Sequence, residues 1–195
     1  MLRAADAPLI GMGDLIVVPG KRVGAITAYS SLAVLQALYG RANVVPRMQP
    51  LPSGDTVPGA RLFAGTDRQI DLLWEEDGRG KRITEVRIVG GAWTLENGLK
   101  TGLALAEAEK IIGKPVRGMS ADGDGGSLAT VDSTLTAAGF GLVIRGAPTV
   151  QAPTEPRRTA GSKKSGSPAP APAPVPAGPR PASNAVVTKM VIWFR

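Results

Sequence analysis

Two segments of the chain are similar to each other, and an internal repeat restricts the architecture of a protein more than any other feature of its sequence. Residues 24–40 align without a gap with residues 97–113, so that corresponding positions differ by 73. Each segment predicts the end of a strand, a short polar turn and a helix of about two to three turns. A glycine, Gly40 or Gly113, follows each helix and ends it. The sequence therefore predicts two copies of one supersecondary unit.

Both predicted helices have one apolar face. In the first copy, leucines recur at every third residue from Leu32 to Leu38, and Ser30 or Ser31 is suited to the N-cap position. In the second copy, the helix is predicted over residues 103–112. Its apolar face is expected to comprise Leu105, Ala108 and Ile111 or Ile112.

Strand patterns follow each helix. After the first helix we expect a proline-rich loop over residues 46–58, and then three strands, at 59–64, 69–74 and 83–89. The last two of these strands flank a charged hairpin, in which Asp77-Gly78 favours a tight turn. After the second helix, strands are expected at 127–131, 140–145 and 186–194.

A segment rich in alanine and proline, residues 147–184, precedes the last predicted strand. Its Ala-Pro repeats favour extended polyproline II backbone and offer few apolar groups for a core. The last strands of the two copies are 104 residues apart, against 73 for the helices, and the difference is close to the length of this segment. We therefore interpret residues 147–184 as an insertion into the second copy.

These patterns predict an α+β fold of two tandem repeats, each a short helix packed on an antiparallel sheet, with a disordered Ala/Pro-rich insertion before the last strand. The predicted first repeat comprises residues 1–92, and the second begins with residues 93–146. Residues 147–184 form the flexible insertion, and residues 185–195 supply the final strand of the second repeat.

The excess of positive over negative charge is concentrated in the insertion. The net charge is +7, and most of this surplus lies within residues 147–184. The candidates for contact with an anionic surface are Arg157, Arg158, Lys163 and Lys164. The segment contains no aromatic residue on which a base could stack, so only weak, salt-sensitive binding of nucleic acid or another anionic polymer is expected. A solubilising insertion without a partner is the alternative interpretation.

The composition removes several classes of active site. The chain contains no histidine and no cysteine, which excludes disulfides, cysteine nucleophiles, zinc sites built on these residues and Ser-His-Asp triads. Asp122 and Asp124 begin a calcium-loop pattern, but Gly126 and Ser133 stand where ligands are required. We interpret this loop as solvated, with weak cation binding as the alternative. We predict no catalytic residue, no cofactor and no metal site.

Aromatic and acidic residues remain as candidates for contact with a partner. They are Trp74, Trp93, Glu75 and Glu76. Tryptophan is frequent at binding hot spots, and sequential carboxylates at a hairpin can form an exposed acidic surface. The alternatives are that the tryptophans, Trp193 included, anchor the core, and that the carboxylates belong to a solvated turn.

Several segments of the chain resemble known proteins. A short helix that ends in Gly113-Lys-Pro115 before an antiparallel sheet, repeated in tandem, resembles the beta-lactamase-inhibitor-protein-like fold. Residues 103–115 also resemble the helix motif of small outer-membrane assembly lipoproteins. Residues 20–145 resemble a group of uncharacterised exported bacterial proteins. The segments that carry this last resemblance are 20–26, 70–77 and 93–102, and more loosely 122–126.

The resemblance implies a non-catalytic protein of the cell envelope, periplasmic or exported, that binds another envelope protein. Members of the group usually carry an export signal, whereas residues 1–10 contain no signal-peptide core, and a cytoplasmic location is the alternative. No apolar run approaches the roughly 20 residues that span a bilayer. Two other functions stay open: a proteinaceous inhibitor of an envelope enzyme, and a weak binder of anionic polymers through the insertion.

Overall fold

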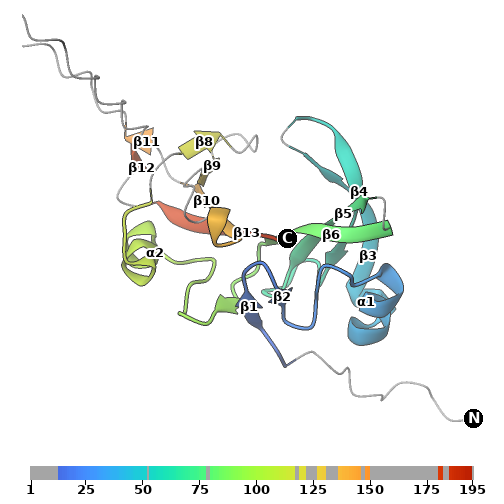
Figure 1. Cartoon of the computed structure of the whole chain (residues 1–195). Coiled ribbons are helices and arrows are strands. Elements are labelled where there is room, and N and C mark those ends of the chain that lie inside the picture. Colours follow the sequence, from blue (N-terminus) through green and yellow to red (C-terminus); the bar gives the residue numbers. More distant parts are fainter. Residues whose placement is uncertain are drawn as a thin grey trace, which may run out of the picture.

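Figure 1 shows the protein as a computed structural model, which describes residues 13–51, 53–77, 80–116, 119–121, 127–130, 136–145, 148–149, 180–181 and 185–194. Within these residues the chain is mostly β-strand with two short α-helices, which confirms the predicted α+β class. The helices are α1 (Leu32–Tyr39) and α2 (Leu105–Ile112), and a 3-10 turn (Arg41–Asn43) follows α1.

The strands form one large sheet, one small sheet and an isolated pair. The large sheet has the order β3-β4-β5-β6-β13-β10-β9-β8, and all of its neighbours are antiparallel. Its strands are β3 (Val44–Pro50), β4 (Thr56–Leu62), β5 (Ile70–Asp77), β6 (Gly80–Ile88), β8 (Met119–Ala121), β9 (Ser127–Thr130), β10 (Phe140–Arg145) and β13 (Val186–Trp193). The small sheet has the order β2-β1-β7, from β1 (Ile16–Val18), β2 (Arg22–Val23) and β7 (Thr94–Leu95).

The centre of the large sheet is the antiparallel pair β6 and β13, in which Arg87 lies opposite Val191. On one side of this pair the sheet continues through β5, β4 and β3, which follow α1 in the chain. On the other side it continues through β10, β9 and β8, which follow α2. Each helix is therefore followed by four strands of the large sheet. The last strand of the first group, β6, pairs at the centre with the last strand of the second group, β13.

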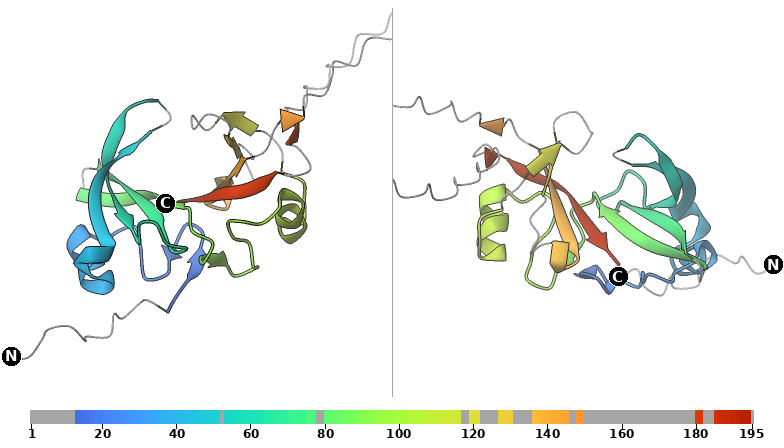
Figure 2. Two further views of the ribbon diagram at one scale, coloured as in Figure 1. Left: turned by 180° about the vertical axis from the view of Figure 1, so that it is seen from behind. Right: turned by 45° about the horizontal axis from the view of Figure 1, so that its top comes forward.

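Both helices and the small sheet cover the same face of the large sheet (Figures 1 and 2). Residues of that face alternate along the strands with residues of the opposite face. On β6, Val86 and Ile88 are buried in a core cluster that includes Leu35 of α1 and Leu105 of α2, whereas Arg87 faces away from it. We call the covered face the helix side and the opposite face the outer face.

The two helices begin and end at corresponding positions of the predicted repeat. Their first residues differ by 73, as do their last residues. The hydroxyl of Ser31 accepts a hydrogen bond from the backbone N–H of Val34 and caps α1, as predicted. Gly40 and Gly113, which follow the helices, both have a positive φ, a backbone conformation that glycine adopts without steric cost.

The prediction of a proline-rich loop over residues 46–58 is wrong, because this segment contains most of β3 and the start of β4. The two strands form a ribbon in which Pro46 lies opposite Ala60, and Pro50 opposite Thr56. The ribbon extends beyond β5, which pairs only with residues 59–62 of β4.

Edge geometry explains why the prolines do not interrupt β3. Hydrogen bonds from Phe63 N to Asn43 O (2.9 Å) and from Leu51 N to Asp55 O (2.8 Å) enclose the ribbon at its two ends. Because bonded and non-bonded positions alternate in an antiparallel pair, the even-numbered residues of β3 direct their backbone groups toward the open edge. Both prolines of β3 occupy even-numbered positions, where the missing N–H removes no bond to β4.

The ladders of β6 and β13 each contain one extra residue. Between the pairs Leu73–Glu85 and Trp74–Ile83, β6 has the additional residue Thr84. In the half of the sheet that follows α2, β13 has the additional residue Thr188, at the point where its pairing with β10 shifts. Such bulges bend a strand and increase its twist.

The predicted insertion lies outside the described residues except at its two ends. There, β11 (Pro148–Thr149) and β12 (Arg180–Pro181) pair with each other as an antiparallel stem. The stem follows β10 and precedes β13 in the chain, and these two strands are neighbours in the large sheet.

Candidate functional site

The two tryptophans proposed as partner contacts lie on the helix side. Trp93 is only 1% exposed, and its indole N–H donates to the carbonyl of Arg68 at 2.9 Å. Its ring is therefore part of the core and offers no surface to a partner, as the alternative interpretation held. Trp74 is half-buried against the core, with its indole N–H 3.4 Å from the carbonyl of Ser30.

The two carboxylates proposed with them lie at the β5–β6 hairpin. Glu75 is exposed and faces Arg82 across the ladder, while the backbone of Glu76 pairs with that of Lys81. Glu75 projects from the outer face, which separates it from Trp74 and Trp93 on the helix side. The four candidates thus do not form one surface.

The remaining sequence-based candidates lie outside the described residues. These are the cations of the insertion, Arg157, Arg158, Lys163 and Lys164, and the carboxylates Asp122 and Asp124. Among the residues that the structure describes, no group of three carboxylates or other metal-binding side chains is placed to hold a metal ion. No described helix is long and apolar enough to cross a membrane.

The outer face carries a row of paired charges across the centre of the large sheet. Arg61 of β4 lies opposite Asp71 of β5, which lies opposite Arg87 of β6, which lies opposite Val191 of β13. The guanidinium of Arg61 donates to both oxygens of Asp71, at 2.7 and 2.8 Å. This bidentate hydrogen bond raises the pKa of Arg61, an effect that burial of the side chain partly offsets.

A second row joins the first through Glu85. One carboxylate oxygen of Glu85 accepts from the guanidinium of Arg87, and the other accepts from the indole N–H of Trp193 at 3.3 Å. Arg87 also donates to the carbonyl of Pro50, at the end of β3, at 2.7 Å. Trp193 is therefore held on the outer face by the charged network, as its position opposite Glu85 in the ladder requires.

Buried apolar side chains lie on the same face as these rows. Leu73 of β5 and Val143 of β10 lie on the outer face, where they are 3% and 1% exposed, and neither belongs to the core cluster of the helix side. Gln49 of β3 is also buried and packs so close to Gly59 that a Cβ at that glycine would lie 2.4 Å from the Gln49 side chain. The outer face is thus an ordered layer with its own packing.

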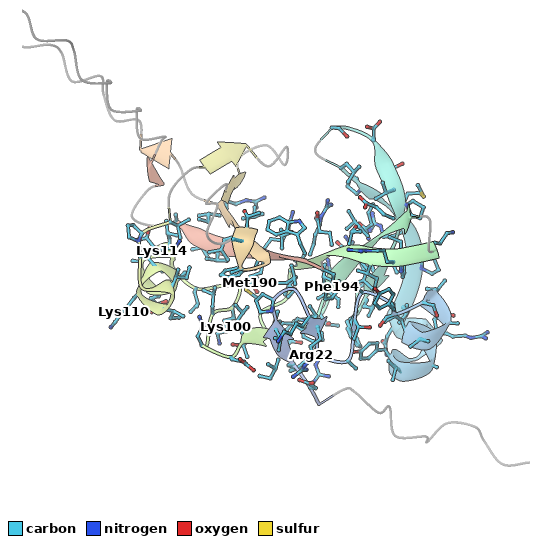
Figure 3. The ribbon with its side chains drawn as sticks, viewed as in Figure 1. Arg22, Lys100, Lys110, Lys114, Met190 and Phe194 are labelled. Atoms are coloured by element: carbon cyan, nitrogen blue, oxygen red, sulfur yellow. The ribbon has the colours of Figure 1, made fainter. Side chains whose placement is uncertain are left out.

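Figure 3 shows side chains projecting on both sides of the central strands, with Met190 of β13 labelled on the sheet and Lys100 and Lys110 on the side of α2. Met190 is fully buried in the helix-side core. Its neighbour Val191 and the indole of Trp193 lie on the opposite face, where they are half-buried. This arrangement gives the outer face an apolar centre beside the paired charges.

The central carboxylates of the outer face are both paired with arginines. Asp71 and Glu85 each accept hydrogen bonds from an arginine of the same face. Aromatic and arginine side chains held in place before binding are typical of protein interfaces. The candidate site is therefore the part of the outer face around Trp193, Arg87 and Val191.

Sequence reasoning placed Trp193 in the last strand but did not select it or the arginines as site residues. The alternation of residues 84–88 predicted a half-buried strand, and this was the available signal that Glu85 and Arg87 share one face. Their contact with Trp193 depends on the pairing of β6 with β13, which are more than a hundred residues apart. No family model matches the chain, and no curated protein and no solved structure matches it.

Proposed function

We propose that the protein is a non-catalytic binding protein of the bacterial cell envelope that contacts another protein through the outer face of its large sheet. The observation that carries this proposal is the ordered network of Trp193, Glu85 and Arg87 on a face that the described helices leave uncovered. The envelope location and the absence of catalysis follow from the resemblance and from the composition of the chain.

The network favours binding because its side chains are already immobilised. An interface loses free energy for each flexible side chain that it orders, and this loss is smaller when hydrogen bonds fix the side chain beforehand. Trp193 is held by Glu85, and Arg87 is held by both Glu85 and the Pro50 carbonyl. A partner that packs on Trp193 would therefore order little that is not ordered in the free protein.

We also infer that the chain consists of two tandem repeats, as the beta-lactamase-inhibitor-protein-like resemblance implies. Three correspondences support this inference. The helices share their bounds at an offset of 73, the bulge residues Thr84 and Thr188 differ by 104, and Arg87 lies opposite Val191 at the same offset of 104. A two-fold axis between two repeats would pass through a pair of equivalent residues of this kind.

The binding proposal is tested with two aromatic variants. Trp193→Ala removes the indole from the outer face, and the matched control Tyr29→Ala removes an aromatic side chain that is 80% exposed before α1. Each tagged variant and the unchanged protein are used to capture proteins from envelope and cytosol fractions of source cells at moderate salt, with mass spectrometry as the readout.

The expected result is one envelope protein retained by the unchanged protein and by Tyr29→Ala but lost with Trp193→Ala. Equal retention by both variants would place binding elsewhere and overturn the proposal. A reproducible hydrolase or transferase activity of the purified chain would overturn its non-catalytic part. Capture from the cytosol alone would overturn the envelope location.

An inhibitor of an envelope enzyme is the second candidate function, and the same rigid face favours it. Inhibitors that bind tightly through interfaces of ordinary size do so with surfaces that change little on binding. If the captured protein is an enzyme, stoichiometric loss of its activity on addition of the chain supports inhibition. Unchanged activity in the complex supports a scaffold role.

A further inference from the structure

We infer that the partner segment that docks on the outer face is acidic: a protein loop with carboxylates around a central apolar or aromatic side chain. This inference rests on the binding function proposed above and names the chemistry of the partner. It is based on the distribution of charge over the outer face and on the apolar centre that Trp193 and Val191 form there.

Three carboxylates of the outer face each have a cationic neighbour. Asp71 is bonded to Arg61 and Glu85 to Arg87, while Glu75 faces Arg82 across the ladder. These pairs neutralise one another, so they contribute no net attraction for a charged partner.

Two further arginines of the same face lie opposite no acidic residue in the described ladders. Arg47 of β3 is exposed opposite Gly59, and Arg145 of β10 is exposed between Ser127 and Val186. Within the described part of the chain, neither forms an ion pair. These two arginines thus stand on opposite sides of the central pair β6–β13.

Carboxylates match these cations in geometry and in charge. The planar guanidinium of arginine donates two parallel hydrogen bonds to a carboxylate, and complementary charges at the rim of an interface accelerate association and suppress wrong partners. The apolar centre between the cations requires a segment that also carries an apolar or aromatic side chain. These features together favour a protein loop over a simple anion.

Nucleic acid fits the face less well. Proteins that bind single strands combine a basic groove with several aromatic side chains on which successive bases stack. Trp193 is the single aromatic side chain that the described residues contribute to the outer face. One stacking position does not make such a platform.

The inference is tested by selecting random constrained peptides from a display library on the immobilised full chain. We expect selected peptides to be enriched in Asp and Glu around an aromatic or large apolar residue, and to lose binding to Trp193→Ala. The double variant Arg47→Glu/Arg145→Glu should weaken the selected peptides by about tenfold. The neutral variant Arg47→Gln/Arg145→Gln should give an intermediate loss, because the effect follows charge.

A control with the same change in net charge is Lys100→Glu/Lys110→Glu, whose exposed lysines lie on the side of α2 (Figure 3). It should change peptide affinity by no more than about twofold, because these charges act through solvent that contains salt. Equal losses in both double variants would show a dependence on net charge alone and would overturn the inference.

The outcomes separate this inference from the proposed function. Selected peptides that depend on Trp193 but show no acidic enrichment overturn the acidic partner and leave the binding face intact. Peptides that bind equally well to Trp193→Ala overturn both. A random-sequence single-stranded oligonucleotide that competes with the selected peptides and depends on Arg47 and Arg145 would assign the face to nucleic acid and overturn the inference.

Discussion

The ion pair between Arg61 and Asp71 allows a quantitative test of how the outer face is held in place. Its two hydrogen bonds are 2.7 and 2.8 Å long, and the Asp71 side chain is 9% exposed while that of Arg61 is 29% exposed. The perturbation is Asp71→Asn, which keeps the shape of the side chain and removes its charge.

The magnitude follows from the exposure of the two partners. Removing one partner from a fully buried pair costs about 3–5 kcal/mol, because the other charge is left buried and uncompensated, whereas exposed pairs contribute less than about 1 kcal/mol. Asp71 is nearly buried, but Arg61 retains contact with water that partly compensates the loss. We therefore expect Asp71→Asn to lower the free energy of unfolding by about 2 kcal/mol.

The assay is urea unfolding of the unchanged protein, Asp71→Asn, Arg61→Met and the double variant, compared as a double-mutant cycle. The coupling free energy should be about 1 kcal/mol or more, since the residues are in direct contact. Asp67→Asn, at an exposed carboxylate, is the matched control and should change stability by less than about 0.5 kcal/mol. A loss at Asp71 as small as that of the control, or additive single effects, would refute the argument that this pair stabilises the face.

Tyr39 and Gly90 give two further stability predictions. The hydroxyl of Tyr39 is buried without a hydrogen-bond partner among the described residues, and burial raises its pKa, with a smaller contribution from Asp14 and an opposing one from the backbone of Ala25. Tyr39→Phe should raise the free energy of unfolding by about 1 kcal/mol at neutral pH. The unchanged protein should lose stability as the pH rises above about 10, because Tyr39 then ionises in the unfolded chain while it stays protonated in the folded one. Urea unfolding measures the free energy of unfolding against pH. Equal slopes above about pH 10 for the unchanged protein and for Tyr39→Phe would contradict this prediction. Gly90→Ala would place a Cβ 2.0 Å from the carbonyl oxygen of Asp67 and should destabilise by about 3 kcal/mol in thermal or urea unfolding, whereas the control Gly91→Ala has 3.6 Å of space and should be tolerated.

Local signals were sufficient for the helices and for the hairpin. Ser31 supplies a cap, leucines repeat on one face and Gly40 ends α1, all within a dozen residues, so that no distant contact is needed to predict this helix. The turn between β5 and β6 was predicted for the same reason. Local signals failed for β3, because two prolines indicate a loop unless the strand is known to lie at the edge of a sheet.

The candidate site could not be predicted in the same way. Trp74 and Glu75 are adjacent in sequence, but alternation along β5 sends their side chains to opposite faces. Trp93 belongs to a segment rich in glycine and polar residues, yet its side chain is buried in the core and its indole N–H donates to the distant carbonyl of Arg68. Which tryptophan faces outward was decided by strand register rather than by residue type.

The sequence by itself determined the helices with their glycine ends, the α+β class, and the positions that alternate between two faces along β6. These properties depend on interactions between residues close in the chain, and the chain order encodes them directly. Only the tertiary structure decided that β6 and β13 meet at the centre of one sheet. That pairing brings Glu85 and Trp193 together across 108 positions of the chain, because backbone hydrogen bonds between strands select a register and not a distance in sequence.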